Sequence, residues 1–207
     1  AVTFFGCNNL IVANLEFKNA QKLHLFFDTC VNVKADNLNV IAPKNSPNTD
    51  GIHVAGTQNI EVMNCVITTG DDCISIINGS RNVRATDITS GPGHGISIGS
   101  LGGNNANAQV SNVVVDGANI SGTTNGVRIK TWQYSAVQIS NVLYNNITGT
   151  SYSEVAIKFN CSKSFACQGI SLRNVDLVRE GYGAIEASCQ NVGLSKRGWV
   201  SPTCPDD

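Results

Sequence analysis

Charge is what this 207-residue sequence has least of. Only 14% of its residues are Asp, Glu, Lys or Arg, against about a quarter in average proteins. A helical bundle needs charged residues on its solvent face, so this composition argues against one. The net charge of −1 creates no overall field that would attract nucleic acid or an anionic membrane. We therefore expect no nucleic-acid partner, and an anionic ligand would have to be bound locally.

Long apolar runs are also missing, since no stretch approaches the roughly eighteen residues that span a bilayer. We expect no membrane association. No signal peptide is visible, and the chain begins at Ala1 in what reads as a strand, so we interpret it as a processed or excerpted chain. Zinc-type spacing is absent among the eight cysteines, which favours an oxidising compartment. Sequons compatible with secretion occur at Asn78, Asn119, Asn146 and Asn160.

The residues that abound are Asn and Gly, with 25 and 20 copies. Both tolerate the left-handed backbone region, and Asn hydrogen-bonds to neighbouring backbone groups, so the chain should turn often. The hydrophobic content of 42% is enough for a buried core in a chain of this length. The composition therefore indicates short strands joined by frequent turns.

A repeat of the form Asn-apolar-x-apolar runs through the chain at intervals of 23 to 30 residues. Its copies begin at Asn9, Asn32, Asn59, Asn82, Asn112 and Asn141, with a variant at Gly169. A second series of short strands alternates with it, and its apolar residues form two sets: Ile52, Ile74, Ile96, Val127, Ile157, Ile185, and Val54, Ile76, Ile98, Ile129, Phe159, Ala187.

Such short strands cannot bury their apolar faces alone, but stacked repeats can. Leucine-rich repeats, the rival solenoid, are excluded because Leu is too sparse and wrongly spaced. The repeat therefore predicts an all-β chain folded as a parallel β-helix, with the two apolar sets as continuous interior ladders. We expect a single domain over residues 1–207, since no linker interrupts the pattern.

Stacking also brings polar residues together, because neighbouring turns of a β-helix lie about 4.8 Å apart. Asp50, Asp72 and His94 occupy equivalent positions before three successive strands, and Asp71 sits beside Asp72. On the next strand, Arg128 and Lys130 share the outward face while Ile129 points inward. These residues should gather three carboxylates, an imidazole and two cations on one surface.

Taken singly, each Asp here could be a turn former. Crowded carboxylates repel one another, however, so stability alone would not select this column, and their pKa values are driven apart as an acid and a base require. Calcium is an alternative ligand, but His94, Arg128 and Lys130 suit a carboxylated substrate better than a cation. Ser75 and Ser97 share the face, yet the G-x-S-x-G motif of many serine hydrolases is absent. We therefore predict no metal and no cofactor.

Four segments carry a family resemblance: SPNTDGIHV (46–54), TGDDCISI (69–76), GPGHGISIGS (91–100) and GVRIK (126–130). In order and approximate spacing they resemble the polygalacturonases of glycoside hydrolase family 28, particularly the plant enzymes, and the similarity covers essentially the whole chain. The resemblance implies a right-handed parallel β-helix. It also implies inverting hydrolysis of the α-1,4-linked galacturonic acid of pectin, which makes pectin the expected partner in cell wall modification.

Carried over by position, the resemblance makes Asp71 the general acid, and Asp50 and Asp72 the pair that holds and deprotonates the attacking water. His94 would maintain the protonation of the acid. Inverting enzymes need their acid and base carboxyls roughly 6.5–9.5 Å apart, a distance that neighbouring turns allow. The substrate-binding residues implied are Arg128 and Lys130, which would grip a galacturonate carboxylate, and Asn48.

The chain also departs from the family. It starts partway along the helix, so the usual cap and first turns are absent, as is an internal turn after Lys130 that carries a cysteine pair and a substrate-contacting Tyr. We do not assign the role of that Tyr to Tyr134. Ser90 stands where relatives have a Cys that would pair with Cys73, which leaves Cys73 a free thiol.

The resemblance further implies two disulfides near the C-terminus, Cys161–Cys167 and Cys189–Cys204. Cys7 and Cys30 could bridge or merely stack, because their positions in successive turns are equivalent. We expect a secreted monomer located extracellularly, in the cell wall. The missing turns keep an inactive pectin-binding protein open as an alternative, and a calcium-dependent pectate lyase is a third. Endo or exo action and the tolerance of substituted pectin stay open.

Overall fold

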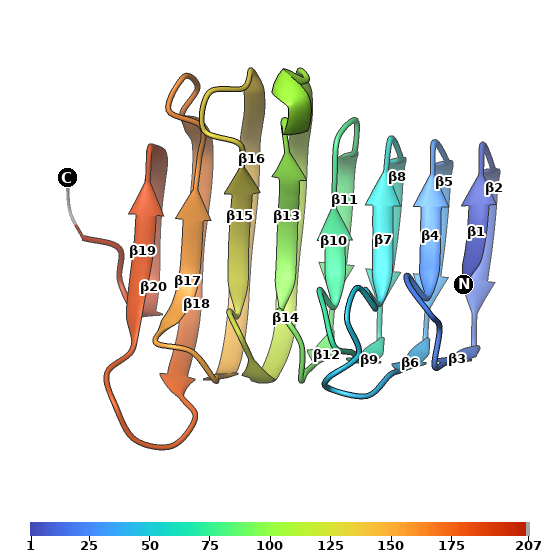
Figure 1. The fold of residues 1–207 in the computed structure, drawn as a ribbon, viewed down its shortest axis with the longest axis horizontal. Helices are drawn as coiled ribbons and strands as arrows, with labels where there is room; N and C mark the ends of the chain where they lie inside the picture. Colours follow the sequence, from blue (N-terminus) through green and yellow to red (C-terminus); the bar gives the residue numbers. More distant parts are fainter. Residues whose placement is uncertain (206–207) are drawn as a thin grey trace.

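The chain folds as a parallel β-solenoid, in the computed structural model that describes residues 1–205. Successive turns stack along one axis, so that strands distant in sequence become parallel neighbours (Figure 1). The prediction of an all-β parallel β-helix is confirmed. The last two residues of the predicted domain, 206 and 207, lie outside the described part of the chain.

The first sheet takes one strand from each turn and carries the candidate site on its outer face. It has eight strands in the order β1 (Val2–Phe5), β4 (Leu25–Asp28), β7 (Ile52–Ala55), β10 (Ile74–Ile76), β13 (Ile96–Leu101), β15 (Val127–Thr131), β17 (Val155–Asn160) and β19 (Glu186–Gln190).

The second sheet forms the rest of the wall. Early turns supply two short strands each: β2 (Asn8–Ala13), β5 (Val31–Asp36), β8 (Gln58–Met63) and β11 (Arg81–Thr86), then β3 (Glu16–Lys18), β6 (Asn39–Ile41), β9 (Val66–Thr68) and β12 (Thr89–Ser90). Later turns supply one long strand each: β14 (Ala108–Thr123), β16 (Val137–Ser151), β18 (Cys167–Arg179) and β20 (Val192–Ser201). Since β14 pairs with both β11 and β12, it joins the two rows of short strands into one sheet.

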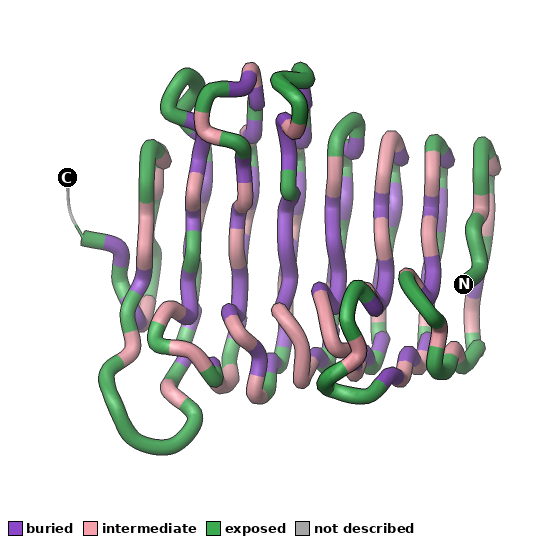
Figure 2. Tube along the Cα trace, viewed as in Figure 1, coloured by how far each residue is buried: buried purple, intermediate pink, exposed green. Residues whose placement is uncertain are grey.

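The interior is filled by ladders of aliphatic side chains, and Figure 2 shows buried segments running through the strands of the middle turns. The predicted rungs Ile52, Ile74, Ile96, Val127 and Ile157 are fully or almost fully buried and directly paired. Each buried aliphatic side chain contributes about 1.5–3 kcal/mol to folding. The polar side chains on the outer face of the first sheet are therefore attached to strands whose inner face is close-packed.

The last rung of each predicted ladder is wrong. Ala187, not Ile185, pairs with Ile157, and Cys189 takes the place beside Phe159 that we expected for Ala187. Both predicted partners therefore lie two positions too early in the sequence. An error of two positions preserves which side chains point inward, so the predicted alternation survives although the register changes.

The repeated Asn residues form a ladder on the outside of the second sheet. The side-chain amide of Asn32 donates to Asn9, and the pattern continues through every copy to Asn141, which donates to Asn112, over distances of 2.8 to 3.2 Å. Each of these Asn residues has a φ between 54° and 57°, the left-handed region that Asn tolerates. We call these six residues the asparagine column.

Both disulfides implied by the resemblance are present, Cys161–Cys167 and Cys189–Cys204. Cys73 is a free, fully buried thiol, and burial raises its pKa to about 11. Cys7 and Cys30, which could have bridged, are both free as well.

Helical structure is represented, within residues 1–205, by the short 3-10 helix η1 (Gly103–Asn105). None of the described helices reaches the length and hydropathy of a membrane-crossing helix.

Candidate active site

Turns that lead into the first sheet place the predicted acidic residues side by side. Asp50 precedes β7, the pair Asp71 and Asp72 precedes β10, and His94 precedes β13. Backbone hydrogen bonds hold these turns in register: Gly51 donates to the Asp72 carbonyl at 2.9 Å, and His94 donates to the Asp71 carbonyl at 2.8 Å. The stacking expected from the sequence therefore occurs, and it brings the carboxylates and the imidazole together.

Asp72 is the most deeply buried charge of the group, with only 3% of its surface exposed. Its Oδ1 accepts hydrogen bonds from the Ser97 hydroxyl at 2.7 Å and from the Arg128 guanidinium, and its Oδ2 accepts one from Lys130 Nζ at 2.9 Å. Ser97 in turn accepts a hydrogen bond from Arg128 Nε. The two cations that we expected to face substrate are thus engaged with a buried carboxylate, which requires such partners.

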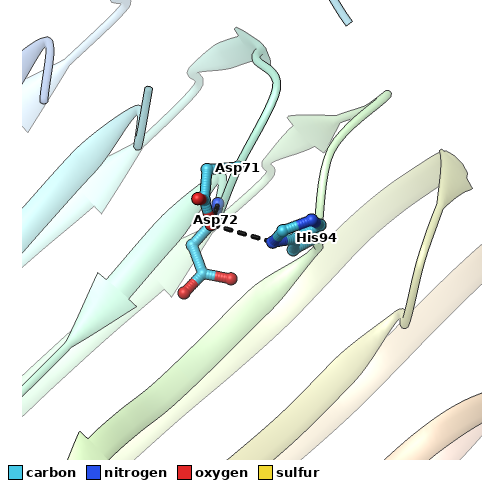
Figure 3. A group of neighbouring side chains, drawn as sticks. All are labelled: Asp71, Asp72 and His94. Atoms are coloured by element: carbon cyan, nitrogen blue, oxygen red, sulfur yellow. Dashed lines mark hydrogen bonds and ion pairs between the residues drawn. The ribbon is translucent and has the colours of Figure 1, made fainter. Parts of the chain in front are cut away.

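Asp71 pairs with His94, as Figure 3 shows. The distance from His94 Nδ1 to Asp71 Oδ1 is 2.8 Å, and the Asp72 backbone amide donates to the same oxygen at 2.8 Å. The hydrogen bond from His94 is the main cause of a lowered pKa of Asp71. In this state Asp71 is a carboxylate near neutral pH, the opposite of what a general acid requires.

Asp50 is held by two residues that sequence reasoning did not assign to the site. The Ser75 hydroxyl donates to Asp50 Oδ2 at 2.7 Å. His53 Nδ1 contacts the same hydroxyl and lies 3.5 Å from Asp50 Oδ2. Both side chains point outward from paired strands of the first sheet, where Ser75 faces His53. Their outward position one turn apart was the available signal for Ser75 and His53.

The loop before β7 braces the turn of the two adjacent carboxylates. Gly70 donates its backbone N–H to the Thr49 hydroxyl at 3.2 Å. A Cβ on Gly70 would lie 2.1 Å from the Ser46 carbonyl oxygen, so only glycine allows the loop to approach this closely. Asn48 lies on this loop with an exposed side chain and a φ of 54°. Within residues 1–205, no hydrogen bond joins the Asn48 side chain to the carboxylates, so its predicted role stays a prediction.

Three groups of the site are close enough to hold a cation in principle, since one ligand atom each of Asp71, Asp72 and His94 lie within 4.8 Å of one another. However, Arg128 and Lys130 already occupy both oxygens of Asp72. A divalent ion would meet these two positive charges, which disfavours metal binding here. The same distance places oxygens of Asp71 and Asp72 closer than the roughly 6.5–9.5 Å that we expected between the acid and base of an inverting enzyme.

A parallel β-helix with carboxylates, an imidazole and cations on one sheet face defines a class, that of β-helical proteins with an acid–base site. Comparison with known sequences identifies the family. The profile of Glycosyl hydrolases family 28 matches residues 1–144 and 133–201. The chain belongs to this family.

Relatives at high identity are plant proteins. Polygalacturonase QRT2 of Arabidopsis thaliana is 53% identical and Polygalacturonase-2 of Solanum lycopersicum is 48% identical, each over 99% of this chain. The chain spans about half the length of these relatives, 56% and 53% respectively.

Solved structures share the fold. Endo-xylogalacturonan hydrolase from Aspergillus tubingensis aligns with a TM-score of 0.83 at 23% identity, over 96% of this chain and 60% of its own. Polygalacturonase from Erwinia carotovora aligns with a TM-score of 0.71 at 27% identity, over 96% and 58%.

Two features of these matches bear on the internal turn that we expected to be missing. The alignment to the Arabidopsis protein spans 244 positions, more than the 207 residues of this chain, so the relative carries residues that this chain lacks. The two family matches both include residues 133–144. This overlap lies directly after Lys130, and it agrees with the loss of a turn at that point.

Proposed function

We propose that the chain is a polygalacturonase that hydrolyses the α-1,4 linkages of galacturonan in pectin. The observation that carries the proposal is the assembly of Asp50, Asp71 and Asp72 on adjacent turns beside His94. Membership of family 28 and the names of the plant relatives support the same activity. No residue of the site calls for a cofactor.

In this proposal Asp71 donates a proton to the glycosidic oxygen. The lowered pKa of Asp71 in the free protein has to be overcome, and the substrate provides two causes that would raise it. Each bound galacturonate brings a negative charge, and the bound sugar displaces water from the partly buried carboxyl. His94, hydrogen-bonded to Asp71, is positioned to supply the proton.

Asp50 and Asp72 are the proposed pair that binds and deprotonates the attacking water. Ser75 and His53 orient Asp50, whereas Ser97, Arg128 and Lys130 fix Asp72. A carboxylate held in one orientation keeps the water in line with the anomeric carbon, and such positioning contributes much of a hydrolase's rate. We propose inversion at the anomeric carbon, and NMR detection of the first-formed anomer tests this directly, because the Asp71–Asp72 spacing alone would suit retention.

The decisive experiment measures reducing ends released from polygalacturonate by the wild-type chain and by Asp71→Asn. We expect the substitution to lower kcat by about 10²–10⁴-fold, the usual contribution of general acid catalysis. Asp116→Asn is the matched control, because Asp116 lies in β14 of the second sheet and accepts hydrogen bonds from Asn145 and Asn146. Equal activity in wild type and Asp71→Asn would refute the proposal.

Two other outcomes identify the alternatives. Binding of oligogalacturonate without turnover would indicate a pectin-binding protein, an alternative that the shortened turn after Lys130 keeps open. An unsaturated product that absorbs in the near ultraviolet and disappears with a chelator would indicate a lyase. The two disulfides are consistent with secretion, and we propose the cell wall as the site of action and a monomer as the active form.

A further inference from the structure

The cations nearest the carboxylates already have partners in the free protein. Arg128 and Lys130 both donate to Asp72, and Arg128 also donates to Ser97. The side chain of Arg128 is only 12% exposed. These hydrogen bonds compensate the buried charge of Asp72, so part of the donor capacity of both cations is used before substrate binds.

The next cation along the sheet is Lys158, in β17. It is directly paired in register with Arg128, and its side chain points outward and is exposed. Within residues 1–205, no ion pair or hydrogen bond engages Lys158. It is therefore the first cation beyond the carboxylates whose charge is available to a ligand.

The pairing of Arg128 with Lys158 sets two positive charges directly opposite each other on adjacent strands, an arrangement that destabilises a sheet. Arg128 and Lys130 are paired with Asp72, and the charge of Lys130 also acts on Asp71, whereas no carboxylate compensates Lys158 among the described residues. Stability alone does not select an uncompensated cation opposite Arg128. A bound carboxylate would relieve the repulsion, as expected for a surface that evolved to hold an anion.

The other end of the same face has no such charge. On the N-terminal side of the carboxylates, the outward residues of β4 and β7 include Phe26 and His53, whose ring centroids lie 4.9 Å apart edge to face, and the acidic Asp28. Among the described strand residues of the first sheet, Lys and Arg occur only in β15 and β17. A polyanionic chain running along the face would therefore find its charge partner there.

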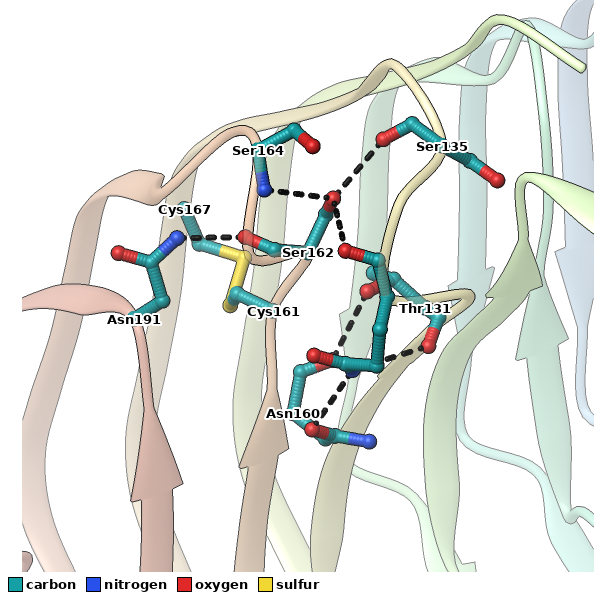
Figure 4. Close-up of a disulfide and its surroundings, with 9 residues drawn as sticks. Thr131, Ser135, Asn160, Cys161, Ser162, Ser164, Cys167 and Asn191 are labelled. Atoms are coloured by element: carbon teal, nitrogen blue, oxygen red, sulfur yellow. Dashed lines mark hydrogen bonds between the residues drawn. A yellow bond between two sulfur atoms is a disulfide. The ribbon is translucent and has the colours of Figure 1, made fainter. Parts of the chain in front are cut away.

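The shortened connection after Lys130 creates this arrangement. The connection from β15 to β16 is hydrogen-bonded to the loop that carries the Cys161–Cys167 disulfide in the following turn (Figure 4). Gln133 Nε2 donates to Asn160 Oδ1 at 2.9 Å. The Ser162 hydroxyl donates to the carbonyl oxygens of Gln133 and Ser135. These bonds join the two turns directly, and β17 pairs with β15 without an intervening strand. A further turn at this point would separate Lys158 from Arg128.

We propose that Lys158 binds a carboxylate of the galacturonan chain one turn beyond Arg128, and so forms a sugar-binding subsite specific to this shortened β-helix. The proposal rests on the proposed function, because it assigns a substrate contact to the same face of the first sheet. Lys158 contacts the substrate without taking part in proton transfer.

The test compares steady-state kinetics on polygalacturonate for wild type, Lys158→Ala, Lys158→Arg and Lys158→Glu. Losing one partly exposed charge pair should raise KM of Lys158→Ala roughly three- to tenfold with kcat within about twofold. Lys158→Arg should retain wild-type KM, and Lys158→Glu should raise KM further. Lys34→Ala is the matched control, because Lys34 is exposed on β5 of the second sheet and should leave KM unchanged.

The outcomes separate this proposal from the proposed function. An unchanged KM in both Lys158→Ala and Lys158→Glu overturns the subsite and leaves the hydrolase assignment intact. If the wild type hydrolyses nothing, the proposed function fails, and calorimetric binding of trigalacturonate to wild type and Lys158→Ala decides the subsite. Equal affinities would overturn it, whereas weaker binding by Lys158→Ala, lost at high salt, supports it.

Discussion

Two columns of polar side chains run along the axis of this β-helix: the asparagine column, and a second column formed by Asp50, Asp72 and His94. The two columns differ in composition. The asparagine column on the second sheet repeats one residue, so that each amide donates to the preceding turn and accepts from the next. The column on the first sheet changes residue at each turn, from Asp50 through Asp72 to His94. A column of identical Asn residues can supply its own hydrogen-bond donors and acceptors. A column of different charged residues needs partners from other strands.

The difference in composition corresponds to a difference in role, because one column stabilises the fold and the other carries the proposed catalytic groups. In the asparagine column the side chains pair with one another along the helix axis, so these hydrogen bonds stabilise the stack of turns. In the first sheet Asp50 and Asp72 take their partners from Ser75, Ser97 and the cations of later turns. These hydrogen bonds hold both carboxyl groups in one orientation, as positioned acid–base groups require.

The largest expected effect is on kcat, and it comes from a substitution of Asp72 in the column formed by Asp50, Asp72 and His94. Asp72→Asn removes a proposed base and leaves Arg128 and Lys130 without a counter-charge, so kcat on polygalacturonate should fall by about 10²–10⁴-fold. Circular dichroism verifies that the β-helix persists. Substantial residual activity in a folded Asp72→Asn would show that Asp72 does not act on the water.

A substitution in the core behind the first sheet should destabilise the whole fold. Ile74 is fully buried in β10, directly behind the site, and Ile74→Ala should lower the free energy of unfolding by about 2–5 kcal/mol through lost burial and the cavity left behind. Urea unfolding measures the change. Ile11→Ala is the control, because 71% of Ile11 is exposed, and it should cost less than about 0.5 kcal/mol; similar losses in the two variants would contradict the assigned core.

Breaking the repeated column should cost stability and leave catalysis intact. Asn82→Ala removes hydrogen bonds to Asn59 and Asn112 and places a Cβ-bearing residue without compensation at a φ of 54°. We expect a loss of about 2 kcal/mol in unfolding free energy. Asn82→Gly should recover about half of this, because glycine tolerates that φ. A fall in kcat for either variant would mean that the two columns are coupled.

The smallest expected effect is a shift in pH dependence. The hydrogen bond from His94 lowers the pKa of Asp71 below its ordinary value of 3.8, so His94→Ala should raise that pKa. Asp71 would then stay protonated to higher pH, and the alkaline limb of kcat/KM that reports Asp71 should move upward. A carboxyl whose pKa is lower in the folded than in the unfolded protein stabilises the fold at pH values above the unfolded-state pKa. This contribution is lost as the pH falls through the folded-state pKa. The stability advantage of wild type should therefore shrink in acid, and an unmoved alkaline limb would exclude Asp71 as the proton donor.

Most of the fold was predictable because the repeat is explicit in the residues. The spacing of Asn9, Asn32 and Asn59 and the alternation around Ile52 and Ile74 require stacked parallel strands. The last rung was not predictable from alternation, since Ile185 and Ala187 are two positions apart and alternation gives them the same direction. The predicted ladder already made Val127 and Ile157 neighbours, so the pairing of Arg128 with Lys158 follows from the sequence.

The sequence by itself determined which residues stack, because a fixed rise per turn turns equal positions in the repeat into neighbours. It thereby placed Asp50, Asp71, Asp72 and His94 on one face. Only the tertiary structure decided how their side chains pair: that Arg128 and Lys130 are engaged with Asp72, and that Ser75 and His53 hold Asp50. Pairing depends on side-chain conformations and on burial, because a buried charge is stable only with a partner. Neither property is visible in the spacing of residues along a chain.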